Sequence, residues 1–295
     1  MKNVELTDEL KQLFIKNIKT PINELISEGK IEDPNLKGFN SSESNTIKDK
    51  HRIRFLNQGR ADFTISTNGL TEFEKVDLYC YYYFQMHFSS SYALFDNEDL
   101  QLKSIVENKD IVFVDYGCGP LTAGIAFRYW FEQNDISFKN FYYQGFDTSP
   151  AMLAKVLLFK DSFGFDFPNL DIYDFSNFCD IARNYNENTI FIINFSYVFA
   201  STSINVEQMI SFVYSFLLNS NAVGKTYIFH QNPSPDYLNK KWEDFKQRIE
   251  GFSPIVNAPQ RIAYEYEDVL GSSKYTKPNF SYGRCTRCDV LKSNA

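Results

Sequence analysis

Apolar positions recur at helical spacing through the first part of the chain. Between residues 5 and 28 they are Leu6, Leu10, Leu13, Phe14, Ile18, Ile22 and Leu25. This spacing predicts an amphipathic helix, and Pro21 is expected to kink or split it. The polar stretch that follows, Glu32 to Lys50, is rich in serine and asparagine and predicts a mobile loop or linker.

A second helical pattern, Thr71 to Asp96, begins with acidic residues, as helix N-termini prefer. It carries a dense set of aromatic side chains: Tyr79, Tyr81, Tyr82, Tyr83, Phe84, Phe88, Tyr92 and Phe95. These rings would cover most sides of a helix. We therefore expect the helix to be largely buried or to form the wall of a pocket.

From about residue 110 the pattern changes to short apolar runs that alternate with helical stretches. Strands are predicted at 111–116, 141–147, 169–174, 189–199 and 224–232, with two more near 261–269 and 280–291. Helices are predicted at 122–133, 149–163, 206–220 and 239–250. This alternation implies a parallel sheet covered on both faces, with ligands bound at the carboxyl ends of its strands.

The composition allows a sizeable core with an unusual load of flat rings. The 295 residues are 43% hydrophobic and 17% aromatic, with 29 Phe and 19 Tyr. Most of these rings are expected in the core, and some could form pockets for flat ligands. The net charge of -7 argues against the broad basic surface of a duplex-binding protein, while a local basic groove for RNA stays compatible with it.

Five cysteines are scattered along the chain: Cys80, Cys118, Cys179, Cys285 and Cys288. Such an odd set is not a disulfide framework. Cys285 and Cys288 form a C-x-x-C pair, but no histidine is near them in sequence, so free thiols are expected rather than a metal site. With neither a signal-peptide core nor an apolar run of about 18 residues, a cytoplasmic protein that does not span a membrane is expected.

The stretch VDYGCGPLTAG, Val114 to Gly124, follows the first predicted strand. Gly117 and Gly119 permit a tight turn and close approach of a ligand to the backbone. The helix that begins near Thr122 would point free N–H groups and a partial positive charge at the same place. Thr122 also stands where the dinucleotide fingerprint requires glycine, which argues against NAD.

Asp147 ends the second predicted strand. A carboxylate at this position can accept hydrogen bonds from both hydroxyls of a ribose. The alternative is an ordinary strand-end or helix-capping acid. Because Asp147 occurs together with the glycine loop, the ribose role is favoured.

These two segments resemble the class I S-adenosylmethionine-dependent methyltransferases. VDYGCGPLTAG resembles their first motif, acid-x-Gly-x-Gly-x-Gly, and GFDTSPAMLAKV resembles their second, in which an acid holds the ribose. The resemblance covers about residues 110 to 235. Within the class, GCGPLTAGIAFRYW and TSPAML resemble the ribosomal small-subunit methyltransferase-like assembly factors of mitochondria and bacteria.

The resemblance implies S-adenosylmethionine as the cofactor and assigns these positions to it: Asp115, Gly117, Gly119, Asp147, Thr148, Asp174 and Phe175. The two glycines would face its aminoacyl part, with Asp115 organising the loop. Asp147 would bind the ribose and Thr148 would lie beside the adenine. Asp174 would accept from the adenine amino group and Phe175 would pack on the ring, although Asp171 could take the place of Asp174.

One departure from the first motif is Leu121, which stands at its third glycine. A leucine side chain there is expected to narrow the space beside the methionine end of the cofactor, unless the loop shifts and Gly124 eases helix packing instead. A degenerate, non-catalytic protein is therefore an alternative to an enzyme.

The transferred methyl group is expected at the end of the fourth strand, where the resemblance places the motif NFSY, Asn194 to Tyr197. Two prolines of the amino-methyltransferase motif are replaced here by Phe195 and Ser196, which disfavours base N-methylation. Methyl transfer mainly requires in-line positioning and exclusion of water, so few catalytic residues are expected. The candidates are Asn194, Tyr197 and His230, with Asn232 nearby, and His230 could act as a base.

The sequence thus predicts an α/β protein with a Rossmann-like, mostly parallel seven-stranded sheet, helices on both faces and an N-terminal helical cap. Residues 1–104 would form the cap and substrate region, and 105–295 the methyltransferase domain. The predicted activity is methyl transfer from S-adenosylmethionine to a small molecule, or to RNA or a ribosomal target. The alternative is a binding or assembly module with a degenerate fold. The oligomeric state stays open.

Overall fold

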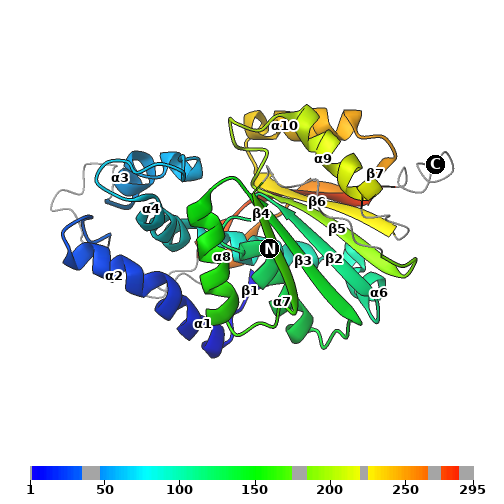
Figure 1. The fold of residues 1–295 in the computed structure, drawn as a ribbon, viewed down its shortest axis with the longest axis horizontal. Helices are drawn as coiled ribbons and strands as arrows, with labels where there is room; N and C mark the ends of the chain where they lie inside the picture. The colour runs from blue at the N-terminus through cyan, green and yellow to red at the C-terminus, as the bar shows by residue number, and fades with distance from the viewer. Residues whose placement is uncertain (1, 35–46, 175–184, 220–224, 265–273, 286–295) are drawn as a thin grey trace.

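The computed structural model describes residues 2–34, 47–174, 185–219, 225–264 and 274–285 (Figure 1). Most of the polar stretch predicted as a loop lies outside these ranges. None of the helices in the described part of the chain has the length and apolarity that crossing a lipid bilayer requires.

A seven-stranded sheet forms the centre of the molecule. Its order is β4 (Asn169–Asp174), β3 (Asn140–Asp147), β2 (Asp110–Tyr116), β5 (Thr189–Ser196), β6 (Lys225–Pro233), β10 (Pro278–Cys285) and β7 (Phe252–Pro259). Only β10 runs antiparallel to its neighbours β6 and β7. The prediction of a mostly parallel seven-stranded α/β sheet is therefore confirmed.

Two strand assignments near the C-terminus need correction. The segment Phe252–Pro259 was not predicted as a strand, but it forms β7 at the edge of the sheet. The strand predicted near 261–269 contributes β8 (Ile262–Tyr264) to a separate three-stranded sheet with β1 (Lys2–Val4) and β9 (Lys274–Thr276). In that small sheet Lys2 pairs with Ile262, so the start of the chain lies against its C-terminal part.

Alternation along the central strands separates two apolar faces. Ile111 and Phe113 of β2 belong to the hydrophobic cluster under α5 (Gln85–Phe95), α7 (Thr122–Gln133) and α8 (Pro150–Ser162). Val112 and Val114 belong to the cluster under α9 (Val206–Asn219) and α10 (Asp236–Arg248). Helices consequently cover both faces, as predicted, with α9 and α10 together on one of them (Figure 1).

The predicted amphipathic N-terminal helix forms, but in three parts. They are α1 (Asp8–Phe14), the π-helical segment η1 (Ile15–Lys19) and α2 (Thr20–Ser27). Thr7 caps the first part, because its hydroxyl accepts from the Leu10 N–H at 3.3 Å. Pro21 lies in the first turn of α2, directly after the π-helical segment. The backbone stays helical at Lys19 and Thr20, so the predicted kink or split takes the form of a change in helix type.

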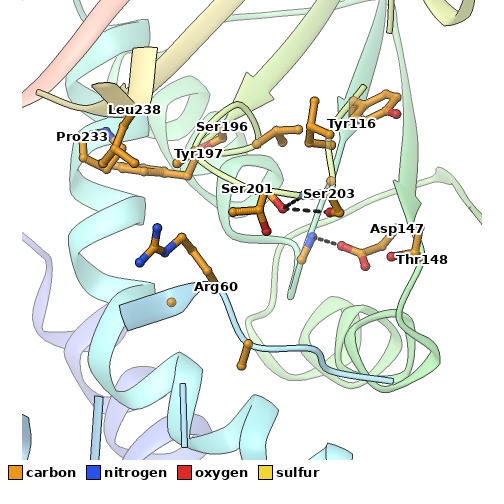
Figure 2. Close-up of a pocket in the computed structure, with 18 of the residues that line it drawn as sticks. Arg60, Tyr116, Asp147, Thr148, Ser196, Tyr197, Ser201, Ser203, Pro233 and Leu238 are labelled. Atoms are coloured by element: carbon orange, nitrogen blue, oxygen red, sulfur yellow. Dashed lines mark hydrogen bonds between the residues drawn. The ribbon is translucent and has the colours of Figure 1, made fainter. Parts of the chain in front are cut away.

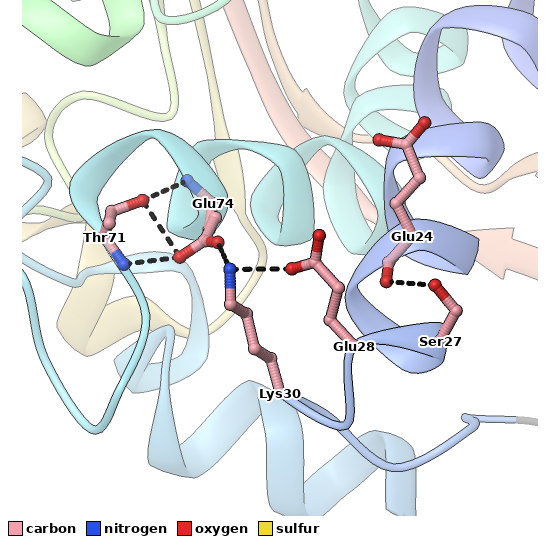
Figure 3. A network of polar contacts seen from close by, with 6 residues as sticks. All are labelled: Glu24, Ser27, Glu28, Lys30, Thr71 and Glu74. Carbon is pink, nitrogen blue, oxygen red and sulfur yellow. Dashed lines mark hydrogen bonds and ion pairs between the residues drawn. The ribbon is translucent and has the colours of Figure 1, made fainter.

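The aromatic helix also contains a π-helical segment. It runs as α4 (Glu72–Tyr79), η3 (Cys80–Phe84) and α5. Thr71 and Glu74 start it with a capping box, in which the Thr71 hydroxyl accepts from the Glu74 N–H and the Glu74 carboxylate accepts from the Thr71 N–H (Figure 3). Lys30 pairs with Glu28 and Glu74, and so links the end of α2 to the start of α4 (Figure 3).

The remaining elements complete the N-terminal region. They are α3 (Ile47–Arg54), η2 (Asn57–Gly59), η4 (Glu98–Leu100) and α6 (Leu102–Val106). The predicted cap and the sheet share one hydrophobic cluster, in which Phe95 of α5 packs on Phe113 of β2 at a ring distance of 5.9 Å. The division at residues 104 and 105 thus remains a prediction about roles, since it does not separate two cores.

Candidate functional site

A cavity of about 1380 Å³ lies at the carboxyl ends of β2, β3 and β5. Its second wall comes from the N-terminal region, through α3, the 58–64 loop, α4, η3 and α5, and a third comes from the 196–208 segment. Single-ligand pockets usually measure roughly 300–1,000 Å³, so this volume has room for a cofactor and a second molecule. Figure 2 shows Asp147 and Thr148 on one side of it and Arg60 and Tyr197 on another.

The glycine loop after β2 borders the cavity. Gly117 has a φ of +69°, and a Cβ there would lie 2.7 Å from Val198 Cγ2. Gly119 has a φ of +50° and open space where its Cβ would be. Because Gly119 lines the cavity, this open space is available to a ligand that approaches the backbone.

Leu121 does not face the cavity. Its side chain is fully buried in the hydrophobic core. The residue adopts the left-handed conformation, with a φ of +66°, and precedes the first turn of α7. A Cβ on Gly124 would lie 2.9 Å from Leu121 Cδ1 and 2.6 Å from Tyr143 Cε2. The expected narrowing of the methionine site is thus not seen, since Gly124 provides the room that Leu121 occupies.

Asp147 lies at the end of β3 and lines the cavity. Its Oδ2 accepts from the Gly119 N–H at 3.0 Å, and its Oδ1 accepts from the Ser149 N–H at 2.9 Å (Figure 2 draws the first bond). Burial raises the pKa of this carboxyl, against the lowering effect of the backbone N–H bonds. The carboxylate therefore joins the glycine loop to the start of α8. Each oxygen keeps further acceptor capacity, and exposed Thr148 lines the cavity beside it.

Asp115 is fully enclosed by the sheet. It accepts from Tyr143 Oη at 2.7 Å and from Asn194 Nδ2 at 2.8 Å, so it ties β2 to β3 and β5. Burial raises its pKa to about 6, although both hydrogen bonds oppose the shift. Neither Asp115 nor Asn194 lines the cavity. The predicted role of Asp115 in organising the loop stays a prediction, and Asn194 lies within the sheet as a partner of Asp115.

The choice between Asp174 and Asp171 follows from strand register. Asp174 ends β4 and pairs with Asp147, whereas Asp171 lies in the middle of the strand and pairs with Gln144. Only Asp174 therefore stands at the carboxyl ends of the strands, where the ribose and adenine are expected. Phe175 lies outside the described residues.

Tyr197 follows β5 and lines the cavity. It has a φ of +62°, and its N–H donates to the Gln231 carbonyl at 2.7 Å, which fixes the turn. Its hydroxyl lies 3.0 Å from Ser90 Oγ, and its ring stacks on His87 with centroids 3.8 Å apart. Burial raises the pKa of Tyr197, so its hydroxyl stays protonated.

His230 and Asn232 of β6 lie away from the cavity lining. The His230 ring is fully buried and stacks on Trp242 of α10, with centroids 4.1 Å apart. Burial and the charge of Lys246 lower its pKa well below the usual value. Asn232 is also buried, and its Nδ2 donates to the Leu238 carbonyl at 2.8 Å. Neither residue is placed to act on a ligand in this cavity, so we leave both out of the proposed site.

Several lining residues were not singled out as site residues by the sequence. Tyr79, Tyr83 and His87 follow one another at intervals of four residues and all line the cavity. The dense aromatics of Thr71 to Asp96 were a usable signal, but the sequence does not say which rings face the core. The 201–204 segment was also missed, and Lys241 holds it by donating to the carbonyls of Ser201, Thr202 and Ile204 at 2.8, 3.0 and 2.8 Å.

Cys285 ends β10, where it is buried and its thiol lies 3.7 Å from the Glu250 carbonyl. Cys288 lies outside the described residues. Within the ranges that the structure describes, no group of three or more His, Cys, Asp or Glu side chains could hold a metal ion.

No protein-family model matches the sequence, and comparison with curated proteins finds no match. Solved structures resemble the fold at low identity. A protein from Listeria monocytogenes assigned to the class I S-adenosylmethionine-dependent methyltransferases is 11% identical, with 95% of this chain and 88% of that one covered and a TM-score of 0.47. Magnesium protoporphyrin IX methyltransferase from Synechocystis with bound S-adenosylmethionine is 11% identical, with 81% and 95% covered and a TM-score of 0.37. An rRNA methylase from Streptococcus thermophilus is 12% identical, with 62% and 90% covered and a TM-score of 0.36.

The sheet and its loops carry the assignment of the fold. In chain order the seven strands lie 3-2-1-4-5-7-6, with only the last of them antiparallel, and a glycine loop follows the first. The chain has a Rossmann-like α/β fold with one antiparallel strand. In this fold the cavity lies where open α/β sheets bind ligands, at the carboxyl ends of strands beside the reversal in strand order.

Proposed function

We propose that the protein binds S-adenosylmethionine in this cavity and transfers its methyl group to a small molecule. One observation carries the proposal: the open face of Gly119 and the carboxylate of Asp147 border the same cavity and are joined by a hydrogen bond of 3.0 Å. A glycine without a side-chain neighbour and an acid at the next strand end are what an aminoacyl group and a ribose require.

The residues present fit the cofactor. Gly117 and Gly119 leave room for its aminoacyl part, whose carboxylate would be stabilised by the start of α7, where helix N–H groups carry partial positive charge. Asp147 would accept from the ribose hydroxyls, and Thr148 and Asp174 would lie along the adenine. When bound, the cofactor supplies a methyl group on a sulfonium that reacts by direct displacement. The protein then mainly has to orient the acceptor and exclude water.

A small acceptor is favoured by the wall that the N-terminal region adds to the cavity. The N-terminal region closes one side of it with the side chains of Tyr79, Tyr83 and His87, which are buried or half-buried. An RNA or ribosomal acceptor is the second candidate, and it is favoured by Arg52 and Arg60 on the cavity lining of a chain whose net charge is -7. The non-catalytic alternative loses one of its supports, because Leu121 does not fill the cofactor site.

Calorimetry with S-adenosylmethionine, S-adenosylhomocysteine and NADH tests the proposal. The protein is expected to bind the first two and not the third. Asp147→Ala should weaken S-adenosylhomocysteine binding at least tenfold through the lost ribose bonds. Because Asp147 also supports the loop, Asp147→Asn, which keeps the volume, should be measured beside it with a thermal melt of each variant.

Asp161→Ala serves as the control, since Asp161 is exposed on α8. Its affinity should equal that of the unchanged protein. Absence of binding by both sulfur compounds would rule out the methyltransferase function. An unchanged affinity in both Asp147 variants would remove Asp147 from the site.

A further inference from the structure

The wall of the cavity opposite the glycine loop is built from stacked rings. Tyr79, Tyr83 and His87 are spaced by four residues, which places them on one face of the helix, and Tyr83 lies within the π-helical segment Cys80–Phe84. Tyr83 and His87 are stacked with centroids 5.8 Å apart, and His87 stacks on Tyr197 at 3.8 Å. Tyr83, His87 and Tyr197 therefore form a stack of rings along the cavity, and Tyr79 meets His87 edge-on.

His87 is the polar member of this stack. Its side chain is 8% exposed, and it lines the cavity. Its Nδ1 lies 3.2 Å from Tyr79 Oη. Within the described part of the chain no hydrogen bond engages Nε2, although the ring is enclosed by Tyr79, Tyr83 and Tyr197. The side chain is largely buried but borders the cavity, so a ring nitrogen without a protein partner can take a group of a bound ligand.

The environment of His87 keeps its ring neutral. Burial lowers its pKa to about 3. The groups packed against it are the phenols of Tyr79, Tyr83 and Tyr197, which carry no charge at neutral pH. When Nδ1 carries the proton and donates it to Tyr79 Oη, Nε2 presents a lone pair to the cavity. His87 can then accept a hydrogen bond from a bound molecule.

We propose that the methyl acceptor is a small planar aromatic compound with a hydroxyl group, whose ring packs against the Tyr83–His87–Tyr197 stack and whose O–H donates to His87 Nε2. The proposal rests on the methyltransferase function proposed above. Arg52 adds selectivity, since it donates to Tyr83 Oη at 3.2 Å and also lines the cavity, where its positive charge disfavours cationic amine acceptors.

The proposed transfer balances in atoms and charge. The acceptor oxygen forms a bond to the methyl carbon, and the carbon–sulfur bond breaks with its electron pair going to sulfur. The hydroxyl proton passes to His87 Nε2 and leaves to solvent after the products. One positive charge is present in the cavity before and after the step, first on sulfur and then on the imidazole. The step therefore adds no net charge to the cavity.

A pair of fluorescent probes tests the proposal on the full-length protein saturated with S-adenosylhomocysteine. 7-Hydroxycoumarin carries the ring and the hydroxyl, and coumarin carries the ring alone. The unchanged protein should bind 7-hydroxycoumarin at least tenfold more tightly than coumarin. In His87→Phe, which keeps a flat ring, the two affinities should agree within twofold, while S-adenosylhomocysteine affinity and the melting temperature stay as they were.

Three results would overturn the proposal: equal affinity of the unchanged protein for both probes, no binding of either, or a preference for the hydroxyl that persists in His87→Phe. Methyl transfer to bulk RNA with none to 7-hydroxycoumarin would also overturn it, in favour of a nucleic-acid acceptor. Failure of the methyltransferase function is distinguishable, because S-adenosylhomocysteine would then not bind, whereas the two coumarins could still be compared on the protein without it.

Discussion

The two walls of the cavity are made in different ways. On the sheet side, backbone geometry forms the surface: Gly117 and Gly119 have positive φ values and Asp147 ends a strand. On the helical side, side chains form it, with Tyr79, Tyr83 and His87 on one face of the aromatic helix. Because backbone geometry restricts which residue types fit, the first wall can be predicted from short sequence motifs. An aromatic wall uses the same residues as any core, so its members are not evident from sequence.

The largest effect among the predicted variants is expected on stability, from substitution of Leu121. If the side chain belongs to the core, Leu121→Ala should lower the free energy of unfolding by roughly 2–5 kcal/mol, because a buried leucine leaves a void. S-adenosylhomocysteine affinity of the folded protein should change less than twofold. Denaturant unfolding and calorimetry measure the two quantities. Tighter binding without loss of stability would show instead that Leu121 restricts the cofactor site.

A pH effect on the sheet side is next in size. The pKa of Asp115 is raised by burial from 3.8 to about 6, so the folded state holds its proton more tightly than the unfolded state. The contribution of this group to stability is therefore fully present below about pH 4 and is lost as pH rises to about 6, by on the order of 3 kcal/mol.

Asp115→Asn is the matched variant, since the amide keeps an acceptor for Tyr143 and the Oδ1 of Asn194, buried without a partner, can turn to accept its N–H₂. The difference in unfolding free energy between the two proteins, measured from pH 4 to 7, should fall with rising pH. A difference that stays constant or rises would contradict the assignment.

The two loop glycines separate stability from ligand binding. Gly119→Ala should lower S-adenosylhomocysteine affinity at least tenfold, because its Cβ would enter the cavity, and should cost only about 1 kcal/mol for the left-handed backbone. Gly117→Ala adds a clash with Val198, so its loss of stability should be greater by roughly 1–3 kcal/mol. Calorimetry measures the affinity and chemical unfolding the stability of both variants. A larger loss of affinity in Gly117→Ala than in Gly119→Ala would show that the cavity face of the loop is wrongly assigned.

The smallest effect is expected on the helical side, away from the cavity. Thr71→Ala removes the capping box at the start of α4 and should cost about 1 kcal/mol, with no change in cofactor affinity. Ser27→Ala is the control, since the Ser27 hydroxyl only donates to the Glu24 carbonyl in the same helix (Figure 3). A thermal melt of each variant measures the difference. A change in cofactor affinity for Thr71→Ala would show that the two walls of the cavity are coupled more closely than the contacts indicate.

Most of the sheet followed from apolar runs, because buried parallel strands are nearly continuous in hydrophobic residues. The exception is β7, which contains Pro254 and Pro259. Proline in a sequence usually indicates the end of a strand, but an edge strand tolerates it, and β7 is the edge strand of this sheet. The short strand β8 was misplaced for another reason: its partner β1 is at the other end of the chain, and no local pattern reports such pairing.

The same limit applies to the candidate site. Gly119, Asp147 and Thr148 line the cavity because motif and backbone geometry coincide there. Two other predicted site residues lie outside the cavity lining because of the direction of their side chains. Asn194 points to Asp115 within the sheet, and His230 points to Trp242 of α10. Successive side chains of a strand point to opposite faces of the sheet, so a prediction that is wrong by one position places the side chain on the opposite face.

The central claim is that the cavity holds the cofactor between Gly119 and Asp147. A crystal structure of the protein with S-adenosylhomocysteine tests it most directly. We expect density for the ribose within hydrogen-bond distance of the Asp147 carboxylate and density for the methionine end beside Gly117 and Gly119. A ligand bound elsewhere, or an empty cavity in crystals grown at a saturating concentration, would contradict the account.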